Sequence, residues 1–205
     1  MNNLSTFYIV RHGQTDWNVK QKVQGHSDIP LNETGEQQAK ELGEKFRDIR
    51  FDLAFSSDLM RAKRTAEIIL LDKKMSVLTS KLLRERNFGN FEGKPGEALT
   101  AFRDLLEKLT EEQKAAHPDN NIETDEAVAQ RLITFIRETA IIHPGKTILT
   151  TTHGGVMRVL LVHLGYGNDE TLPYGCIANL AYIKLETDGV DFFIKETEGV
   201  TRIEQ

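Results

Sequence analysis

The sequence contains a single cysteine, Cys176, in 205 residues. No internal disulfide can therefore form, and a zinc site built from cysteine ligands is excluded. The chain also lacks a basic segment followed by an apolar core at its start, and no apolar run approaches membrane-spanning length. We therefore expect a cytoplasmic protein with no membrane partner.

An excess of positive charge is also absent, because 26 Lys and Arg residues stand against 31 Asp and Glu residues, for a formal net charge of -5. Nucleic-acid and anionic-membrane surfaces demand excess Lys and Arg, so we expect no nucleic-acid partner. A small basic pocket for an anionic ligand is compatible with this balance. The length and the 39% hydrophobic content favour one globular domain, residues 1–205, and they set no oligomeric state.

Strand and helix signals alternate along the chain, which favours an α/β architecture. Apolar or β-branched runs predict strands at residues 6–10, 52–56, 76–79 and 147–152, and a closing hairpin at 178–185 and 190–196. Helical spacing predicts helices that end near residue 46 and that span about 59–70, 125–142 and 156–164. Ser57 or Asp58 is expected to cap the second of these. Residues 94–123 are charged and partly helical, and they are interpreted as a cap or lid.

Two of the predicted strands end in a histidine followed by a glycine. Arg11 and His12 follow the apolar run at residues 7–10, and His153 follows the β-branched run at 147–152. In open α/β sheets, ligands bind at the carboxyl ends of the strands. We therefore expect the two imidazoles to converge on one site.

Arginine side chains are expected at the same edge of the sheet. Arg61 lies one turn into a helix that follows a strand, and Arg11 precedes the first histidine. The planar fork of arginine binds phosphate oxygens in pairs. The helix start after His153 and Gly154 would add backbone N–H groups for an anion. Together these residues predict a pocket for a phosphoryl group.

A phosphoryl group beside a histidine suggests a covalent reaction. A neutral imidazole can attack phosphorus and form a phosphohistidine. The neighbouring arginine charges should depress the pKa of His12 and keep it neutral. Glu85 is the best candidate for protonating the leaving group and then for activating water. His153 and the arginines would stabilise charge on the phosphoryl oxygens. No cluster with metal-ligand spacing is evident, so we expect no metal and no cofactor.

These segments resemble the signatures of the histidine phosphatase superfamily, the phosphoglycerate mutase-like group. Residues 7–18 are similar to its first histidine motif, 83–89 and 91–93 to its acid-bearing segment, and 152–156 to its second histidine motif, with further similarity at 31–39, 56–62 and 65–66. The resemblance covers most of the chain in the expected order. It implies a three-layer α/β/α sandwich with a mostly parallel central sheet and a small helical cap insertion at 94–123.

The resemblance also implies roles for individual residues. His12 would be the phosphorylated nucleophile and Glu85 the proton donor, with Arg11, Arg61 and His153 forming the phosphate pocket. The substrate-binding residues implied are Arg11, Asn18, Gln24, Gly25, Arg61, His153 and Gly154. Neither a metal nor a cofactor is implied.

Three departures from the mutase pattern favour a phosphatase. Mutases of this type tend to carry a longer cap with an adjacent arginine pair, whereas residues 94–123 contain only Arg103. The two residues after Arg86 are Asn and Phe, where mutases usually show His and Tyr. Gln24 stands where mutases typically have Thr.

The sequence thus predicts a phosphatase that hydrolyses small phosphate monoesters without a metal, its partner being a small phosphorylated metabolite. A cofactor-dependent phosphoglycerate mutase and a non-catalytic phosphate-ester sensor are the alternatives. Intact His12 and Glu85 argue against the sensor, which needs neither a nucleophile nor an acid. His26 and Lys94 are further candidates for contact with the substrate.

Overall fold

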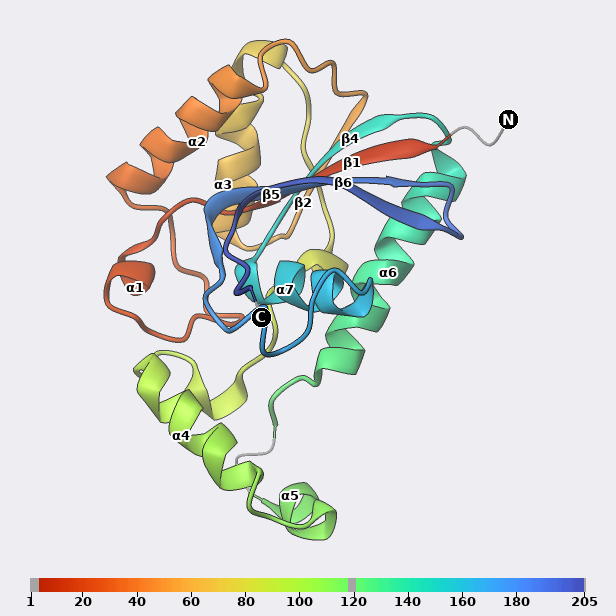
Figure 1. Ribbon diagram of the computed structural model, residues 1–205. Helices are drawn as coiled ribbons and strands as arrows, with labels where there is room; N and C mark the ends of the chain where they lie inside the picture. The colour runs from red at the N-terminus through yellow and green to blue at the C-terminus, as the bar shows by residue number, and fades with distance from the viewer. Residues whose placement is uncertain (1–3, 118–120, 205) are drawn as a thin grey trace.

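The computed structural model of the protein describes residues 4–117 and 121–204 (Figure 1). In chain order, the elements are β1 (Ser5–Arg11), α1 (Asp16–Val19), α2 (Glu33–Lys45), β2 (Leu53–Ser56), α3 (Met60–Ile69), β3 (Leu78–Thr79), α4 (Gly96–Leu106), α5 (Glu111–Ala116), α6 (Asp125–Ile142), β4 (Thr147–Thr152), α7 (Gly154–His163), β5 (Ile177–Thr187) and β6 (Phe192–Val200). Short 3-10 helices lie at Leu71–Lys73, Lys81–Leu83 and Gly89–Phe91.

The described strands form a six-stranded sheet in the order β3-β2-β4-β1-β5-β6. β1, β2, β3 and β4 pair in parallel, whereas β5 and β6 add an antiparallel hairpin at one side. The predicted mostly parallel sheet is therefore confirmed. Because β1 and β4 are adjacent and parallel, their carboxyl ends meet at the same edge of the sheet.

Alternate residues of β1 pack into two separate hydrophobic cores. Phe7 and Ile9 pack with residues of α6 and α7, whereas Tyr8 and Val10 pack with residues of α2 and α3. Successive side chains of a strand point to opposite faces of its sheet, so each face of this sheet needs its own cover. Figure 1 shows α2 and α3 on one face and α6 and α7 on the other. The predicted three-layer sandwich is confirmed.

Most predicted boundaries match the structure within a few residues, with local exceptions. The third strand is shorter than predicted, and residues 16–19, within the segment 13–32 that the sequence predicts as a loop, form the short helix α1. The predicted capping of α3 by Ser57 or Asp58 is wrong, because the residue before the helix is Leu59 and it makes no side-chain cap. Instead the carboxylate of Asp28 accepts from the N–H of Met60 at 2.7 Å. A loop distant in sequence therefore supplies the acceptor.

Helices α4 and α5 lie within residues 94–123 and extend away from the sheet (Figure 1). A third, smaller core joins α4 to the rest of the protein and contains Val23, Phe91, Leu99 and Phe102. Residues 118–120 of the predicted cap lie outside the described part of the chain. That this segment caps the site stays a prediction.

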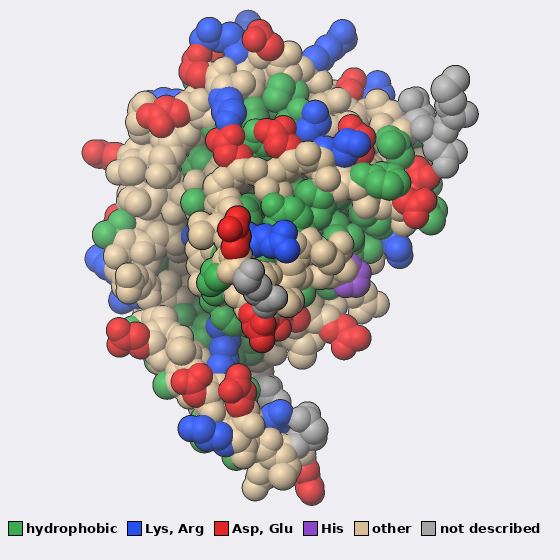
Figure 2. All heavy atoms as spheres, in the orientation of Figure 1, with side chains coloured by type: hydrophobic (Ala, Val, Ile, Leu, Met, Phe, Trp, Pro, Cys, Tyr) green, Lys and Arg blue, Asp and Glu red, His purple; other side chains and the backbone are tan. Residues whose placement is uncertain are grey.

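The surface mixes both signs of charge. On the face shown in Figure 2, the described acidic and basic side chains are interspersed rather than gathered into one broad patch. None of the helices in residues 4–117 and 121–204 is long and apolar enough to cross a membrane. Over the same residues, no three His, Cys, Asp or Glu side chains are grouped so that they could hold a metal ion.

Candidate active site

The two predicted histidines lie side by side at the carboxyl edge of the sheet. His12 follows β1, and its backbone N–H donates to the carbonyl of Thr152 at the end of β4 at 3.0 Å. His153 follows Thr152 directly and is the N-cap residue of α7. The two imidazole rings are 5.2 Å apart between centroids, and both side chains are buried. The predicted convergence of the imidazoles is confirmed.

A hydrogen bond determines which nitrogen of His12 carries the proton. Nδ1 lies 2.7 Å from the carbonyl oxygen of Gly13. A carbonyl only accepts, so Nδ1 is the donor, and in the neutral ring Nε2 then keeps its lone pair. Asn179 donates to the His12 carbonyl at 2.9 Å, and the Gly13 N–H donates to Thr65 Oγ1 at 3.0 Å. Hydrogen bonds from side chains distant in sequence therefore fix the backbone at both His12 and Gly13.

Burial and positive charge keep both histidines neutral. Burial lowers the pKa of His12 well below its usual range, and the charges of Arg61 and Arg11 lower it further. Burial also lowers the pKa of His153 well below its usual range, followed by the charge of Arg61. The predicted direction for His12 is confirmed, although desolvation outweighs the arginine charges that the sequence suggested.

Arg61 is fully buried in the first turn of α3, and two backbone carbonyls hold its guanidinium group. Its Nη1 donates to the carbonyl of Ser27 and its Nη2 to that of Gly25, both at 2.7 Å. Burial lowers its pKa to about 10, so the group stays charged at neutral pH. These two bonds occupy only part of its N–H donors, and the others are left for an anion.

Several buried nitrogen atoms at this edge have no hydrogen-bond partner among the described residues. They are Nε of Arg11, Nε of Arg61 and both ring nitrogens of His153. Arg11 Nη1 donates to the carbonyl of Ile177, and burial lowers the pKa of Arg11 while the charge of Glu85 opposes this. Buried polar groups are normally paired, so this cluster of cationic and neutral donors fits an anionic ligand.

The carboxylate of Glu85 lies against the N-terminus of α7. Its Oε2 accepts from the N–H of Gly155 at 3.0 Å, and its Oε1 accepts from the N–H of Arg86 at 2.8 Å. A Cβ at Gly155 would lie only 2.6 Å from Oε1, so any side chain there would displace the carboxylate from this position. The Glu85 carbonyl accepts from His26 Nε2 at 2.9 Å and from Arg131 Nη2 at 3.1 Å. His26 thus holds the backbone of the acid-bearing segment.

Glu92 connects two loops of the site, a role that the sequence analysis missed. Its Oε1 accepts from the N–H of His26, and its Oε2 from the N–H and hydroxyl of Ser27, at 2.8 to 2.9 Å. The same loop contains Gly25, whose φ is +54° and whose added Cβ would meet Glu92 Oε1 at 2.1 Å. The loop carbonyls hold Arg61, so Glu92 supports the arginine indirectly. The signal was the motif Phe-Glu-Gly at residues 91–93, to which no role was given.

Asn18, Gln24 and Lys94 are the remaining residues that were predicted as candidates for contact with the substrate. Asn18 Oδ1 accepts from the N–H and hydroxyl of Thr15 at 3.1 and 3.0 Å, which leaves its amide nitrogen as the donor for a ligand. Gln24 is buried, and its Oε1 has no hydrogen-bond partner in the described part of the chain. Lys94 Nζ lies 4.9 Å from the ring centroid of Phe91.

A cleft of about 530 Å³ opens at this edge of the sheet. Its lining includes Arg11, Glu85, Gly154 and Gly155 from the sheet edge, Arg158 from the next turn of α7, Leu99 and Arg103 from α4, and Lys22 and Tyr174 from loops. The volume is in the range of pockets for small molecules. Of the predicted phosphate-binding residues, Arg11 and Gly154 line this space together with residues of α4, whereas Arg61 and His153 are not part of its lining.

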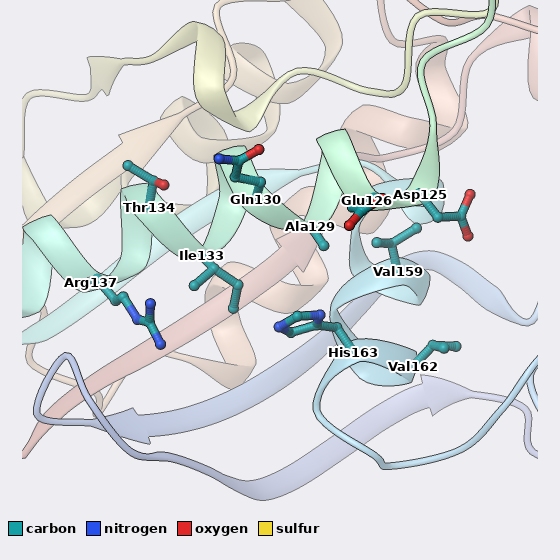
Figure 3. A pocket seen from close by; sticks show the side chains of 10 residues that line it. All are labelled: Asp125, Glu126, Ala129, Gln130, Ile133, Thr134, Arg137, Val159, Val162 and His163. Carbon is teal, nitrogen blue, oxygen red and sulfur yellow. The ribbon is translucent and has the colours of Figure 1, made fainter.

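A second hollow, of about 680 Å³, lies between α6 and α7 (Figure 3). Its lining includes Ile133 and Arg137 from α6 and Val159 and His163 from α7. It contains none of the predicted site residues, and its one histidine is exposed rather than buried. The cleft at the sheet edge, by contrast, is lined by Arg11, Glu85 and Gly154.

Comparisons with known proteins agree with this geometry. The model of the histidine phosphatase superfamily (branch 1) matches residues 7–198. The chain is 37% identical over 181 residues to the uncharacterized phosphatase PhoE of Bacillus subtilis (strain 168), covering 85% of this chain and 86% of that protein. It is 36% identical over 184 residues to the broad-specificity phosphatase YOR283W of Saccharomyces cerevisiae, covering 82% and 74%. The crystal structure of phosphoglycerate mutase from Bacillus anthracis str. Sterne has a TM-score of 0.80 at 30% identity, covering 97% of this chain and 94% of that one.

Proposed function

This chain belongs to the histidine phosphatase superfamily, and from that premise we propose that it hydrolyses small phosphate monoesters through a phosphohistidine on His12. The observation that carries the proposal is the Nδ1 hydrogen bond to Gly13, which leaves Nε2 of His12 as a free nucleophile beside a group of anion donors. The phosphatase names of two relatives support hydrolysis. Arg11 and Arg61 supply the positive charge, so the proposed reaction needs no metal.

The phosphoryl group would bind against the unpartnered donors of the sheet edge. Nε of Arg11, Nε of Arg61 and the ring of His153 are buried there without hydrogen-bond partners in the described residues. The amide nitrogen of Asn18 and the N-terminus of α7 at Gly154 add neutral donors. A buried site strengthens these charge-assisted bonds, because water does not screen them.

In the first proposed step, Nε2 of His12 attacks phosphorus and the bond from phosphorus to the leaving oxygen breaks. Glu85 gives its proton to that oxygen. Each Glu85 carboxyl oxygen accepts one backbone N–H, so a second position on each oxygen is available to carry this proton. The imidazole becomes positive when it is phosphorylated, and its Nδ1–H keeps donating to the Gly13 carbonyl, which stabilises that charge.

In the second proposed step, water attacks the phosphorus of the phosphohistidine. Glu85, now a carboxylate, takes a proton from this water, and the bond from phosphorus to Nε2 breaks. Inorganic phosphate leaves, and His12 returns to the neutral form that its lowered pKa favours. The buried arginines stabilise the charge on the phosphoryl oxygens in both steps.

A phosphoglycerate mutase is the second candidate. The Bacillus anthracis protein of that name shares 30% identity and a TM-score of 0.80 with this chain. In a mutase, the phosphoryl group on His12 would pass to a second hydroxyl instead of to water. The two candidates share the first step and differ in the acceptor of the second.

The deciding experiment is phosphate release from para-nitrophenyl phosphate in EDTA. We expect metal-independent turnover, reduced by roughly 10³-fold or more in His12→Ala, because the variant lacks the nucleophile. His163→Ala, an exposed histidine in the second hollow, is the matched control and should keep full activity.

No turnover by the unaltered protein would contradict the phosphatase. Isomerisation of a monophosphoglycerate that depends on added 2,3-bisphosphoglycerate would then place the mutase first. Tight binding of phosphate esters with neither reaction would indicate a sensor.

A further inference from the structure

The peptide unit between Glu85 and Arg86 is hydrogen-bonded on both of its sides. Its N–H, which belongs to Arg86, donates to Oε1 of the Glu85 carboxylate at 2.8 Å. Its C=O, which belongs to Glu85, accepts from the side chains of Arg131 and His26. In a planar trans peptide unit the N–H and the C=O point in opposite directions. The direction of this C=O therefore determines whether the N–H faces the carboxylate.

Arg131, near the start of α6, donates to three carbonyls of the acid-bearing segment. Its Nη1 donates to the carbonyl of Leu82 at 2.8 Å and to that of Arg84 at 2.6 Å, and its Nη2 donates to that of Glu85 at 3.1 Å. The Arg131 side chain is only 15% exposed, so little water competes for these bonds. Because the guanidinium group is planar and rigid, binding three carbonyls at once fixes their relative directions.

The carboxylate of Glu123 occupies the remaining donors of Arg131. Nε donates to Oε1 at 2.6 Å, and Nη2 donates to Oε2 at 3.0 Å. Burial raises the pKa of Glu123, but the hydrogen bonds and the charge of Arg131 outweigh it, and the pKa lies below its usual range. All five N–H donors of Arg131 thus have protein acceptors, unlike those of Arg11 and Arg61, whose Nε atoms are unpartnered among the described residues. Arg131 is therefore built to hold protein and not an anion.

His26 approaches the same Glu85 carbonyl from a different part of the chain. Its Nε2 lies 2.9 Å from the carbonyl oxygen, and because a carbonyl only accepts, this nitrogen carries the proton. The backbone N–H of His26 donates to Glu92 at 2.8 Å, which fixes the loop behind the ring. Two donors from separate elements thus hold one carbonyl in one direction.

We propose that Arg131, supported by His26, is a positioning residue for Glu85, because it holds the peptide unit between residues 85 and 86 with its N–H against the Glu85 carboxylate. This inference rests on the proposed function, since it assumes that Glu85 is the acid. Without Arg131 the peptide unit can rotate and its N–H leaves Oε1. The carboxyl group then keeps only the N–H of Gly155 as a donor and loses its fixed place at the leaving oxygen.

The first test compares two classes of leaving group. Arg131→Met removes all five donors and keeps an unbranched apolar chain. We expect kcat for alkyl phosphates, which need the proton, to fall about 10- to 100-fold, and kcat for aryl phosphates to fall about threefold or less. A variant that only destabilised the fold would slow both classes alike. Arg131→Lys should recover part of the alkyl rate, because it returns the charge without the planar fork.

Arg137→Met, at an exposed arginine of the same helix, is the matched control and should leave both rates unchanged. His26→Ala removes the other donor to the Glu85 carbonyl without altering α6, so it serves as the second variant if Arg131→Met does not fold. We expect it to slow alkyl phosphates about tenfold and aryl phosphates less, since one hydrogen bond is lost.

Hydrogen exchange measures the peptide unit without using activity. In Arg131→Met the N–H of Arg86 should exchange about tenfold faster or more, because its carboxylate acceptor is lost, whereas the amides of β1 and β4 should exchange as before. An unaltered exchange rate at Arg86 would overturn the proposal, as would alkyl and aryl rates that change by the same factor.

Failure of the proposed function gives a different result, because the unaltered protein would then turn over no ester. The exchange rate at Arg86 decides in that case. Faster exchange in Arg131→Met supports the hold on the peptide unit without catalysis, and an unaltered rate removes it.

Discussion

The two sides of the cleft are built in different ways. On the sheet-edge side, backbone groups hold the side chains: Gly13 and Thr152 position His12, carbonyls at 25 and 27 hold Arg61, and the Gly155 N–H contacts Glu85. Around Tyr174, by contrast, side chains contact one another, as Arg103 and Arg158 do at its ring, and of these two arginines only Arg158 is also held by a backbone carbonyl, that of Leu172.

This difference separates chemistry from recognition. Backbone contacts at strand ends and helix starts leave little freedom, which suits groups that must meet a reacting phosphorus within a fraction of an ångström. Arg103, on α4, can be exchanged without moving the sheet. Substitutions on the sheet-edge side should therefore slow every ester, whereas substitution of Arg103 should change which ester is preferred.

The largest effect beyond the nucleophile is expected at Glu85. Glu85→Gln keeps the shape of the side chain but cannot donate a carboxyl proton, so kcat for alkyl phosphates should fall about 10²- to 10⁴-fold. Aryl phosphates should be slowed much less, because their leaving groups need little protonation. Glu126→Gln, in the second hollow, is the control. Equal slowing of both ester classes would remove Glu85 as the acid.

Gly155 tests whether backbone groups alone position Glu85, because glycine has no side chain that could contact the carboxylate. In Gly155→Ala the new Cβ would lie 2.6 Å from Glu85 Oε1, so the carboxylate must shift. We expect kcat for alkyl esters to fall about 10- to 100-fold, since an ångström of misplacement costs that much. Aryl esters are the internal control and should be slowed less, because their leaving groups need little protonation. An unaltered kcat in Gly155→Ala would show that the glycine does not position the acid.

Glu92→Gln tests whether Glu92 fixes the loop whose carbonyls bind the Arg61 guanidinium group. The amide keeps one acceptor but places an NH₂ group against the N–H donors of residues 26 and 27. We expect kcat/KM to fall about tenfold, by the same factor for phosphate esters whose organic part is anionic and for those whose organic part is neutral. A change in the ratio between those esters would contradict the division between the two sides.

Lowering the pH should destabilise the folded protein, because His12 and His153 are buried in their neutral forms at the sheet edge. The folded pKa values of His12 and His153 lie well below the usual 6.5, so below about pH 6.5 the unfolded chain binds more protons than the folded one. The free energy of unfolding should then decrease as pH falls, by about 1.4 kcal/mol per pH unit for each histidine. Urea unfolding between about pH 7.5 and 5 measures this slope.

In His153→Gln, the dependence of the free energy of unfolding on pH should decrease by the contribution of one histidine. In His163→Ala, which replaces an exposed histidine, this dependence should be unchanged. A slope that is the same in both variants would show that His153 is charged in the folded protein.

Sequence patterns were most reliable where the structure is local or periodic. A buried parallel strand shows as an apolar run, and its last residue must lie at the carboxyl edge, so His12 and His153 could be placed together from sequence alone. Contacts between distant segments left no such pattern. The cap of α3 comes from Asp28, and His26 contacts the Glu85 carbonyl instead of standing free for a ligand.

The cap arginine shows this limit most clearly. Within residues 94–123, Arg103 stands alone, and the sequence was interpreted as lacking an arginine pair. In the fold, Arg158 from α7 meets it at Tyr174. The two arginines are adjacent in space but lie on different helices, α4 and α7, far apart in the sequence. No short sequence motif could therefore reveal the pair.

The sequence by itself determined the layered fold, the family and the residues proposed for the chemistry, because strand periodicity and the Arg-His-Gly and His-Gly endings are encoded within a few neighbouring residues. Only the tertiary structure decided the tautomer of His12, the burial that lowers its pKa, and the meeting of Arg103 and Arg158 at Tyr174. Those properties depend on which distant groups pack together and exclude water, and that information is distributed over the whole chain.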